Sequence, residues 1–335
     1  MVKFFAKKIL AFIPTFFLIT LVSFALIRLV PGDPVMLLLG ERGANPATYL
    51  ELKTNLGLDK PLPIQYLNFM KNFFQGDFGT SIVSHISVWE EFKIHFPATV
   101  ELSIVALIWS TILGIGFGIL AAYKKNSLFD VSLMSISLAG YSLPIFWWGL
   151  MLIMFFSLKL NLMPISGRIN ILYEIPEITG FMLIDSLKSE YGWTGFWDAL
   201  HHLILPSVVL GTIPFAILAR ITRTTILEVI NEDYIKAAKA RGIPMKKIVI
   251  HYSLKNALIP IITMMGILLG SLLTGAILTE TIFSIPGMGK WLLGAVEARD
   301  YPVIQSSLIL ITLIIMFINI LVDLIYALIN PKVRR

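Results

Sequence analysis

Six long stretches of the chain contain no Asp, Glu, Lys or Arg, and apolar residues dominate each of them. They cover residues 9–27, 102–122, 131–158, 199–219, 256–279 and 303–322. A helix of about 20 apolar residues crosses a bilayer, so each stretch is long enough for one span. Apolar and polar positions do not alternate at period two, as a membrane barrel requires. The pattern therefore predicts an all-α polytopic membrane protein with six transmembrane helices.

The segments between these stretches are unequal in length. Residues 28–101 form a long outer segment in which Pro and Gly residues mark turns and aromatic residues predict short packed helices. The first stretch is longer than the apolar core of a secretory signal, which has roughly 7–15 residues, and no small-residue cleavage site follows it. We therefore expect it to be retained as the first span of a single transmembrane domain over residues 1–335.

The composition supports a chain that lies mostly in lipid. Hydrophobic residues make up 56% of the 335 residues and charged residues 14%, and the mean hydropathy is +0.81. A water-soluble globule would expose much of that apolar surface at a cost of about 25 cal/mol per Å². The chain has no cysteine, which excludes disulfides, thiolate metal sites and a cysteine nucleophile.

Basic residues predict the orientation of the chain. Although the net charge is +6, 16 of the 27 Lys and Arg residues lie on one set of connecting segments. Under the positive-inside rule both termini, residues 123–130 and residues 220–255 face the cytoplasm, and the segments 28–101, 159–198 and 280–302 lie outside. Because the charge reports orientation, we expect membrane lipid around the spans and no nucleic-acid partner. The basic residues counted are Lys3, Lys7, Lys8, Lys124, Lys125, Arg220, Arg223, Lys236, Lys239, Arg241, Lys246, Lys247, Lys255, Lys332, Arg334 and Arg335.

The sequence shows no motif for catalysis or cofactor binding. Residues 286–290 contain a Gly-Lys pair but lack the earlier glycine and the following Ser or Thr of a phosphate-binding loop. His201 and His202 are adjacent, whereas a metal shared on one helix requires a spacing of about three or four residues, so we expect an interfacial, solvated pair. No stretch carries a carboxylate at its midpoint, which counts against proton-coupled transport. We expect neither a catalytic site nor a metal site in this chain.

Glycine pairs predict where spans pack closely. Gly114 and Gly118 form one small-xxx-small pair, and Gly266 and Gly270 form a second. We expect each pair to face a neighbouring helix. Prolines within the apolar stretches are expected to kink their helices, at Pro144, Pro206, Pro214 and Pro260.

A short cytoplasmic helix is predicted within the basic, loop-forming segment 220–255. Asn231 suits its N-cap, and an acidic first turn follows at Asp233. Gly242 suits the residue after the C-cap, where a left-handed conformation ends many helices. The predicted helix covers residues 232–241. Because a helix of this length is marginal alone in water, we expect it to gain its order by docking.

The side chains of this short helix indicate a docking surface. Ala237, Ala238 and Ala240 keep part of its surface low, so that another surface can approach closely, while Tyr234 and Ile235 provide larger contacts. A helix lying on the anionic inner leaflet is the alternative, but it explains neither the acidic first turn nor the alanines. The residues expected at the docking surface are Asp233, Tyr234, Lys236, Ala237, Ala238, Arg241 and Gly242.

The short helix resembles the EAA-type loop in the membrane subunits of ATP-binding-cassette (ABC) importers. The motif covers residues 233–242 and continues at 256–260. Lys236 stands where the general pattern has Glu, and the stretch from Gly242 to Pro260 is long, as in the dipeptide, oligopeptide and nickel branch of the family. Further segments resemble that branch, at residues 31–36, 56–61, 76–79, 278–287, 299–305 and 322–326. The segments most similar to the first permease subunit of bacterial dipeptide importers are 140–149, 166–168, 179–185 and 210–214.

The resemblance implies a type I importer permease in the bacterial inner membrane. Such a subunit forms an alternating-access pathway with a second, similar permease, driven by two cytoplasmic ATPase subunits and supplied by an extracytoplasmic substrate-binding protein. ATP and magnesium would bind to the ATPases, so no cofactor is expected in this chain. Residues 232–241 would be the coupling helix that docks on one ATPase, and the outer segments would meet the binding protein.

The resemblance favours dipeptides as the substrate. Nickel and oligopeptides are alternatives, because the permeases for these substrates share the same general sequence pattern. A proton-driven carrier, and a membrane scaffold or enzyme without transport, belong to other functional classes. Uptake that survives ATP depletion but collapses with a protonophore would indicate the carrier, whereas co-purification with two ATPases and a second permease would identify an ABC importer.

Overall fold

The computed structural model describes residues 2–29, 35–36, 46–55 and 58–329. Within these ranges all regular secondary structure is helical apart from an isolated bridge between Thr80 and Ser87, which confirms the predicted all-α class. The chain divides into two compact units, where the sequence pattern alone suggested one domain. Some features of the sequence lie outside the described residues, namely the segments 31–34 and 56–57 and the basic residues Lys332, Arg334 and Arg335.

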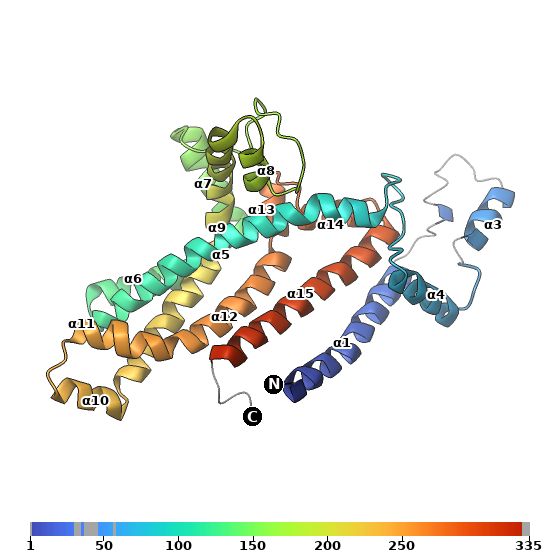
Figure 1. Ribbon diagram of the computed structural model, residues 1–335. Helices are drawn as coiled ribbons and strands as arrows, with labels where there is room; N and C mark the ends of the chain where they lie inside the picture. Colours follow the sequence, from blue (N-terminus) through green and yellow to red (C-terminus); the bar gives the residue numbers. More distant parts are fainter. Residues whose placement is uncertain (1, 30–34, 37–45, 56–57, 330–335) are drawn as a thin grey trace. The chain divides into compact units, whose positions relative to one another are not determined.

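The first unit, here called the N-terminal unit, contains residues 2–94 and 291–316. It holds α1 (Val2–Leu29), α3 (Pro46–Asn55) and α4 (Leu62–Phe74), together with the first turns of α5 (Val88–Tyr123) and the first half of α15 (Tyr301–Ile329) (Figure 1). The hydroxyl groups of Thr20 on α1 and Tyr66 on α4 lie 2.8 Å apart. Met70 and Phe73 of α4 are buried, as expected for a short packed helix in this segment.

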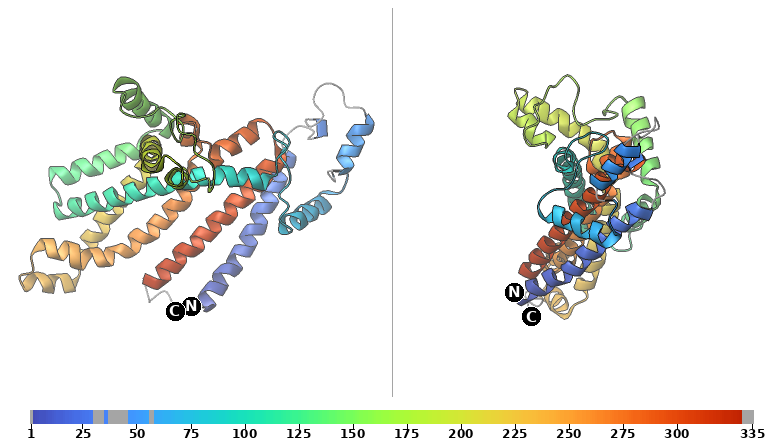
Figure 2. Two further views of the ribbon diagram at one scale, coloured as in Figure 1. Left: turned by 45° about the horizontal axis from the view of Figure 1, so that its top comes forward. Right: turned by 90° about the vertical axis from the view of Figure 1, so that its right-hand side faces the viewer.

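The second unit, here called the main unit, contains residues 95–290 and the chain from residue 317. Its central helix is α9 (Gly192–Ile230), and α6 (Leu128–Ser142), α8 (Met182–Lys188) and α12 (Leu254–Gly275) pack along it (Figures 1 and 2). Two apolar cores form on α9, one around Leu210 and the other around Leu218. The remaining elements are α7 (Ile145–Leu152), the π-helix η1 (Ile153–Lys159), α10 (Asp233–Ala240), α11 (Met245–Lys247), the π-helix η2 (Ile248–Ser253), α13 (Ile277–Ile282) and α14 (Met288–Glu297), whose later residues belong to the N-terminal unit.

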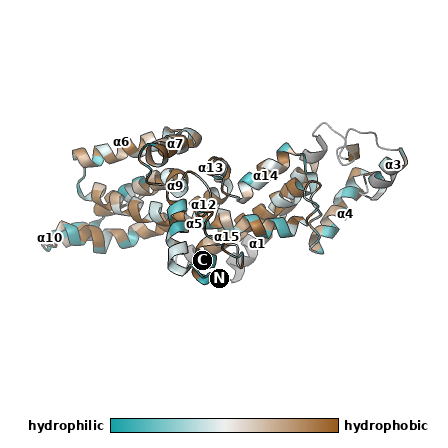
Figure 3. Cartoon of the chain, turned by 90° about the horizontal axis from the view of Figure 1, so that it is seen from above, coloured by the Kyte–Doolittle hydropathy of each residue, from teal (hydrophilic) through white to brown (hydrophobic). Residues whose placement is uncertain are grey.

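Among the described residues, four helices are long and apolar enough to cross a membrane, namely Val88–Tyr123, Gly192–Ile230, Met245–Gly275 and Tyr301–Leu324. The pair formed by α6 and α7–η1 adds a fifth crossing if it is counted as one span, and the apolar helix Phe12–Ala25 within α1 is shorter. Figure 3 shows hydrophobic residues along α6, α9 and α12 and hydrophilic residues on α10. The described residues therefore contain four long apolar helices and a bent pair where the sequence pattern predicted six spans.

The helices extend beyond the charge-free stretches that predicted them. α5 begins at Val88 rather than near residue 102. The predicted loop 220–255 is likewise helical over much of its length, since α9 ends at Ile230, α10 covers Asp233–Ala240 and the next helix starts at Met245. Charged residues end a stretch because they avoid hydrocarbon, but a helix can continue into water with its backbone still paired.

The prediction of one helix over residues 131–158 is wrong. Two helical segments, α6 and α7–η1, meet there at an angle of 106°. Pro144 causes the break because its ring disfavours helical backbone in the residue before it, and Leu143 is extended, with φ −77° and ψ 134°. α7 starts directly after the proline, and Trp148 Nε1 donates a 3.2 Å hydrogen bond to Thr212 Oγ1 on α9. The other three prolines lie inside continuous helices, at Pro206, Pro214 and Pro260.

The glycine pair on α5 lies directly against α9. A Cβ atom built at Gly118 would lie 2.6 Å from Cβ of Thr222. One built at Gly114 would lie 2.9 Å from the nearest side-chain atom of α9. Real Cβ atoms essentially never approach a neighbour so closely, so only glycine fits these positions without movement of the helices. In the second pair, Gly266 faces α15 and Gly270 is buried.

Replacing Gly118 with leucine is expected to lower the thermal stability of the detergent-solubilised protein. The added side chain forces α5 away from α9, and overpacking of this kind costs about 1–3 kcal/mol. Gly116 provides a matched control, because a Cβ atom at that position meets nothing within 4 Å. Melting temperatures of the two variants, followed by size-exclusion fluorescence after heating, should therefore differ clearly. Equal melting temperatures would contradict the close contact between α5 and α9.

Candidate functional site

The candidate functional site is centred on α10, the short helix between α9 and α11. It covers Asp233–Ala240, close to the predicted range 232–241. The N-cap prediction is wrong, because Asn231 is the C-cap of α9 and its side-chain amide donates to the carbonyl of Leu227. Glu232 precedes α10 in an extended conformation, and its side chain makes no capping hydrogen bond. Asn231 therefore ends α9 and does not begin α10.

α10 ends in the turn predicted at Gly242. This glycine has φ +75°, and its N–H donates to the carbonyl of Lys239 at 2.9 Å. The N–H of Ile243 donates to the carbonyl of Ala238 at 3.2 Å. These are the paired bonds of the Schellman motif, which satisfy carbonyls that a helix end leaves unpaired. Since a side chain strains the backbone at this φ, Gly242 determines where α10 stops.

α10 presents two different faces. The helix packs on α9 and η2, and its buried side chains are Ile235, which is fully buried, and Ala238, which is 6% exposed. The side chains on the other faces are exposed, namely Asp233, Tyr234, Lys236, Ala237, Lys239 and Ala240, and Arg241 follows them. α10 therefore packs on its own chain through one face, and its other face is exposed.

The expectation that Ala238 belongs to the docking surface is wrong. Residues three apart lie on the same side of a helix, so Ala238 shares the buried side with Ile235. Ala237 and Ala240 are the small residues that the exposed face presents. Lys236 and Asp233 form a 2.7 Å ion pair on that face, but both side chains are more than half exposed, so the pair contributes little stability.

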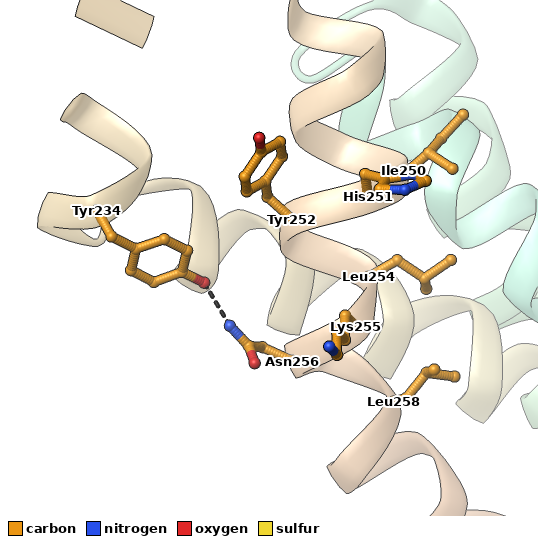
Figure 4. Close-up of a pocket in the computed structure, with 8 residues that line it drawn as sticks. All are labelled: Tyr234, Ile250, His251, Tyr252, Leu254, Lys255, Asn256 and Leu258. Carbon is orange, nitrogen blue, oxygen red and sulfur yellow. Dashed lines mark hydrogen bonds between the residues drawn. The ribbon is translucent and has the colours of Figure 1, made fainter. Parts of the chain in front are cut away.

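A hollow of about 540 Å³ lies beside α10, where η2 continues into α12 (Figure 4). The side-chain amide of Asn256 donates a 2.5 Å hydrogen bond to the hydroxyl oxygen of Tyr234 and so joins α12 to α10. The residues that line the hollow are Tyr234, Ile250, His251, Tyr252, Leu254, Lys255, Asn256 and Leu258. Aromatic and apolar walls with a few hydrogen-bonding groups are typical of a surface that contacts another protein.

The end of the main unit beside α10 is firmly packed. Ile230 of α9, Val249 of η2 and Ile261 of α12 belong to one apolar core. Close by in sequence, Arg223 of α9 makes two hydrogen bonds to Asp130 of α6, from Nε to Oδ1 at 2.5 Å and from Nη2 to Oδ2 at 2.7 Å. The Asp130 side chain is 2% exposed. α10 is therefore attached, through α9 and η2, to helices that continue into the apolar spans.

Sequence reasoning missed η2 and the contact between Tyr234 and Asn256. The charged residues after Gly242 favour a loop, but buried residues recur every four positions, at Val249, Ser253, Ala257 and Ile261. That spacing is typical of a helix with one buried side, but the polar residue Ser253 interrupts the apolar pattern that the sequence itself displays. The hydrogen bond to Asn256 joins residues 22 positions apart and has no comparable signal in the sequence.

The histidine pair lies in the main unit, on α9. The expectation of a solvated pair is wrong for His202, which is 9% exposed and whose Nδ1 lies 2.9 Å from the carbonyl oxygen of Asp198 one turn earlier. His201 Nε2 lies 2.9 Å from the carbonyl oxygen of Leu162. Both rings therefore contact backbone carbonyls. Among the described residues, no group of three or more His, Asp or Glu side chains is placed to hold a metal ion.

Two families of known proteins match the chain. Residues 114–335 match the inner membrane component of binding-protein-dependent transport systems, and residues 1–103 match the N-terminal part of membrane components of these systems. The di/tripeptide transport system permease protein DppB of Pseudomonas aeruginosa is 51% identical over 334 residues, covering 100% of this chain and 99% of that protein. The dipeptide transport system permease protein DppB of Escherichia coli strain K12 is 48% identical over 338 residues, with the same two coverages.

A solved structure shares the fold. A chain of the MetNI methionine ABC transporter, in a crystal form described as inward facing, superposes with a TM-score of 0.51 over 70% of this chain and 93% of that chain. The two sequences are 17% identical, so the similarity concerns the fold alone. It supports the type I importer permease fold that the sequence predicted.

Proposed function

Because this chain belongs to the family of inner membrane components of binding-protein-dependent transport systems, we propose that it is a permease subunit of an ABC importer for dipeptides. It forms half of the pathway that carries them across the bacterial inner membrane. The observation that carries the proposal is the match along the whole chain to permeases of di/tripeptide and dipeptide transport systems. The chain acts as a transport subunit, and the chemistry of ATP hydrolysis belongs to its partners.

The partners in this proposal are a second, similar permease, two ABC ATPase subunits and an extracytoplasmic substrate-binding protein. ATP and magnesium bind to the ATPases, so this chain requires no cofactor of its own. The exposed face of α10 supports docking of one ATPase there. Its small residues Ala237 and Ala240 allow close approach, and Tyr234 beside them is 44% exposed and offers a ring for contact.

The proposed orientation places both termini and α10 in the cytoplasm. The 16 basic residues on the segments of that side support it, and they include Lys236, Lys239 and Arg241 on or next to α10. Lipid surrounds the spans. The outer side then contains the segments 28–101, 159–198 and 280–302, which face the binding protein.

A permease for dipeptides has to accept many different side chains. Discrimination therefore rests mainly with the binding protein, while the permease offers a wide and weakly interacting path. The apolar stretches contain Ser, Thr, Gly and Met and have no charge at their midpoints, which supports such a path. A nickel chelate could cross a similar path, so the substrate has to be tested directly.

Deleting the gene should abolish growth of an amino-acid auxotroph on a dipeptide as its only source of that amino acid. A plasmid carrying this chain should restore growth in a strain without other peptide transporters. Free amino acid serves as the control, because it enters by other carriers. Unchanged growth on the dipeptide, together with lost nickel accumulation or lost growth on longer peptides only, would contradict the dipeptide assignment.

A further inference from the structure

A fully buried carboxyl group lies at the outer end of α12. Glu280 is on α13, five residues beyond the last residue of α12, and its side chain is 0% exposed. Thr99 Oγ1 on α5 donates a 2.5 Å hydrogen bond to Glu280 Oε1. The backbone N–H of Lys290, in the first turn of α14, donates to Oε2 at 3.0 Å. One side chain thus connects α13 and the following helix α14 to α5, which lies far from both in the sequence.

The backbone around Glu280 is fitted closely to its carboxyl group. A Cβ atom at Gly287 would lie 2.3 Å from Glu280 Cδ, and one at Gly289 would lie 3.0 Å from Oε2. Thr99 Oγ1 also accepts a 2.8 Å hydrogen bond from the N–H of Met288. Ser284, in the loop between α13 and α14, has φ +51°, a strained value that a free loop would relax. These contacts hold residues 283–290 in one conformation against α5.

The contacts of Glu280 with Thr99 and Lys290 are here called the joint. The span that precedes α13 connects this joint to the candidate docking site on α10. Residues Met245–Gly275 form one long span, and η2 at its inner end packs on α10. At its outer end the chain turns at Ala276 into α13, which carries Glu280. Any displacement of α10 by a partner is therefore delivered along α12 to an end that is fastened to α5.

We propose that Glu280 is a positioning residue for import, which fastens the outer end of α12 to α5 so that the two helices move as one body when the pathway opens and closes. This inference rests on the proposed function. Without the joint, movement of α10 would tilt α12 alone and leave α5 behind. ATP hydrolysis would then continue with little transport.

The strength of the joint is expected to depend on pH, and the raised pKa of Glu280 determines the direction of the change. Burial raises the pKa of Glu280, and the hydrogen bonds from Thr99, Lys290 and Gly289 only partly oppose this effect. A carboxyl group whose pKa is raised by folding is best accommodated when protonated, so the joint is strongest at acidic pH and weakens as the pH rises through the raised pKa. Among the ionisable side chains on the elements around it, His95 contacts the Pro286 carbonyl, Glu101 is paired with Arg168 and the side chain of Lys290 is exposed. Others are Glu90, Glu91 and Lys93 near the start of α5 and Glu297 at the end of α14.

The distance between spin labels on α5 and α13 tests whether the joint holds, and this measurement does not require transport. The chain contains no cysteine, so labels on Ile104→Cys of α5 and Leu278→Cys of α13, both nearly half exposed, give a single distance in a complex assembled with cysteine-free partner subunits. We expect a narrow distance distribution at acidic pH that broadens as the pH rises. Glu280→Gln, a neutral group of the same shape, should keep it narrow at every pH, and Thr99→Val should broaden it at every pH. His95→Gln should retain the wild-type pH profile.

The second readout is the amount of dipeptide imported per ATP hydrolysed in proteoliposomes. This ratio should fall about fivefold or more in Thr99→Val and Glu280→Ala, which corresponds to the lower range of coupling free energies between sites. Glu280→Gln should keep the wild-type ratio, and that ratio should no longer depend on the outside pH. Distances in Glu280→Ala that match the wild type at all pH values, or an unchanged import ratio in a complex that transports, would overturn the inference. A wild-type complex that imports no dipeptide would contradict the proposed function instead, and the label distances would still decide whether the joint exists.

Discussion

Replacing Ala237 with tryptophan is expected to reduce ATP-driven dipeptide uptake at least about tenfold, which corresponds to 1.4 kcal/mol of lost docking free energy. Ala237 lies on the exposed face of α10, so a large side chain there blocks the close approach of an ATPase. The buried residues Ile235 and Ala238, which seat α10 on its own chain, are not altered. Uptake by whole cells, normalised to the abundance of the protein in the membrane, measures the effect.

Three further variants separate docking from folding. Ala237→Ser keeps the side chain small and should transport normally. Ala238→Trp places the same large group against the buried face and should unseat α10, so that the protein becomes less abundant as well as inactive. Gly242→Val forces a branched side chain into a left-handed conformation at a cost of about 1–2 kcal/mol. Normal uptake by Ala237→Trp at normal abundance would show that α10 does not dock an ATPase.

Replacing Arg223 with alanine is expected to destabilise the protein by about 3–5 kcal/mol, because it leaves the buried carboxylate of Asp130 without its partner. The two residues join the start of α6 to the part of α9 that leads to α10. We therefore expect transport to fall together with the melting temperature of the complex in detergent.

A double variant provides the decisive comparison for this pair. Asp130→Asn with Arg223→Met removes both charges, and it should recover much of the stability that Arg223→Ala loses. The exposed pair of Lys236 and Asp233 provides the matched control, since replacing both with alanine should change the free energy of unfolding by less than about 1 kcal/mol. Equal melting temperatures for Arg223→Ala and the wild type would contradict a structural role for the buried pair.

The sequence predicted those parts of the fold that depend on local chemistry. Stretches without charge located the apolar helices, because a charged side chain in hydrocarbon is costly. The start of α5 was beyond that signal, since Val88 and the residues after it lie in a helix that carries charges. The bend at Pro144 was readable as a kink but not as a turn of 106°, because the size of a kink depends on what the next helix packs against.

In the candidate site, too, features set by neighbouring residues could be predicted, and contacts between residues far apart in the sequence could not. Gly242 was identified because a left-handed turn needs glycine at that point of the chain. Ala238 was wrongly assigned to the exposed face of α10. Its side of the helix packs against α9 and η2, and the residues near Ala238 in the sequence do not indicate these contacts. The partners of Glu280 could not be predicted either, since Thr99 lies 181 positions away and supplies the donor that joins α13 to α5.

Transport by the reconstituted complex distinguishes an ATP-driven importer from a proton-driven carrier. The complex purified through a tag on this chain is placed in proteoliposomes with ATP inside and a radiolabelled dipeptide with the binding protein outside, on the side opposite α10. We expect accumulation that requires ATP, the binding protein and an unaltered α10, and that continues when a protonophore is added. Accumulation that persists without ATP and stops with the protonophore, or a complex that contains no ATPase subunit, would contradict the proposed function.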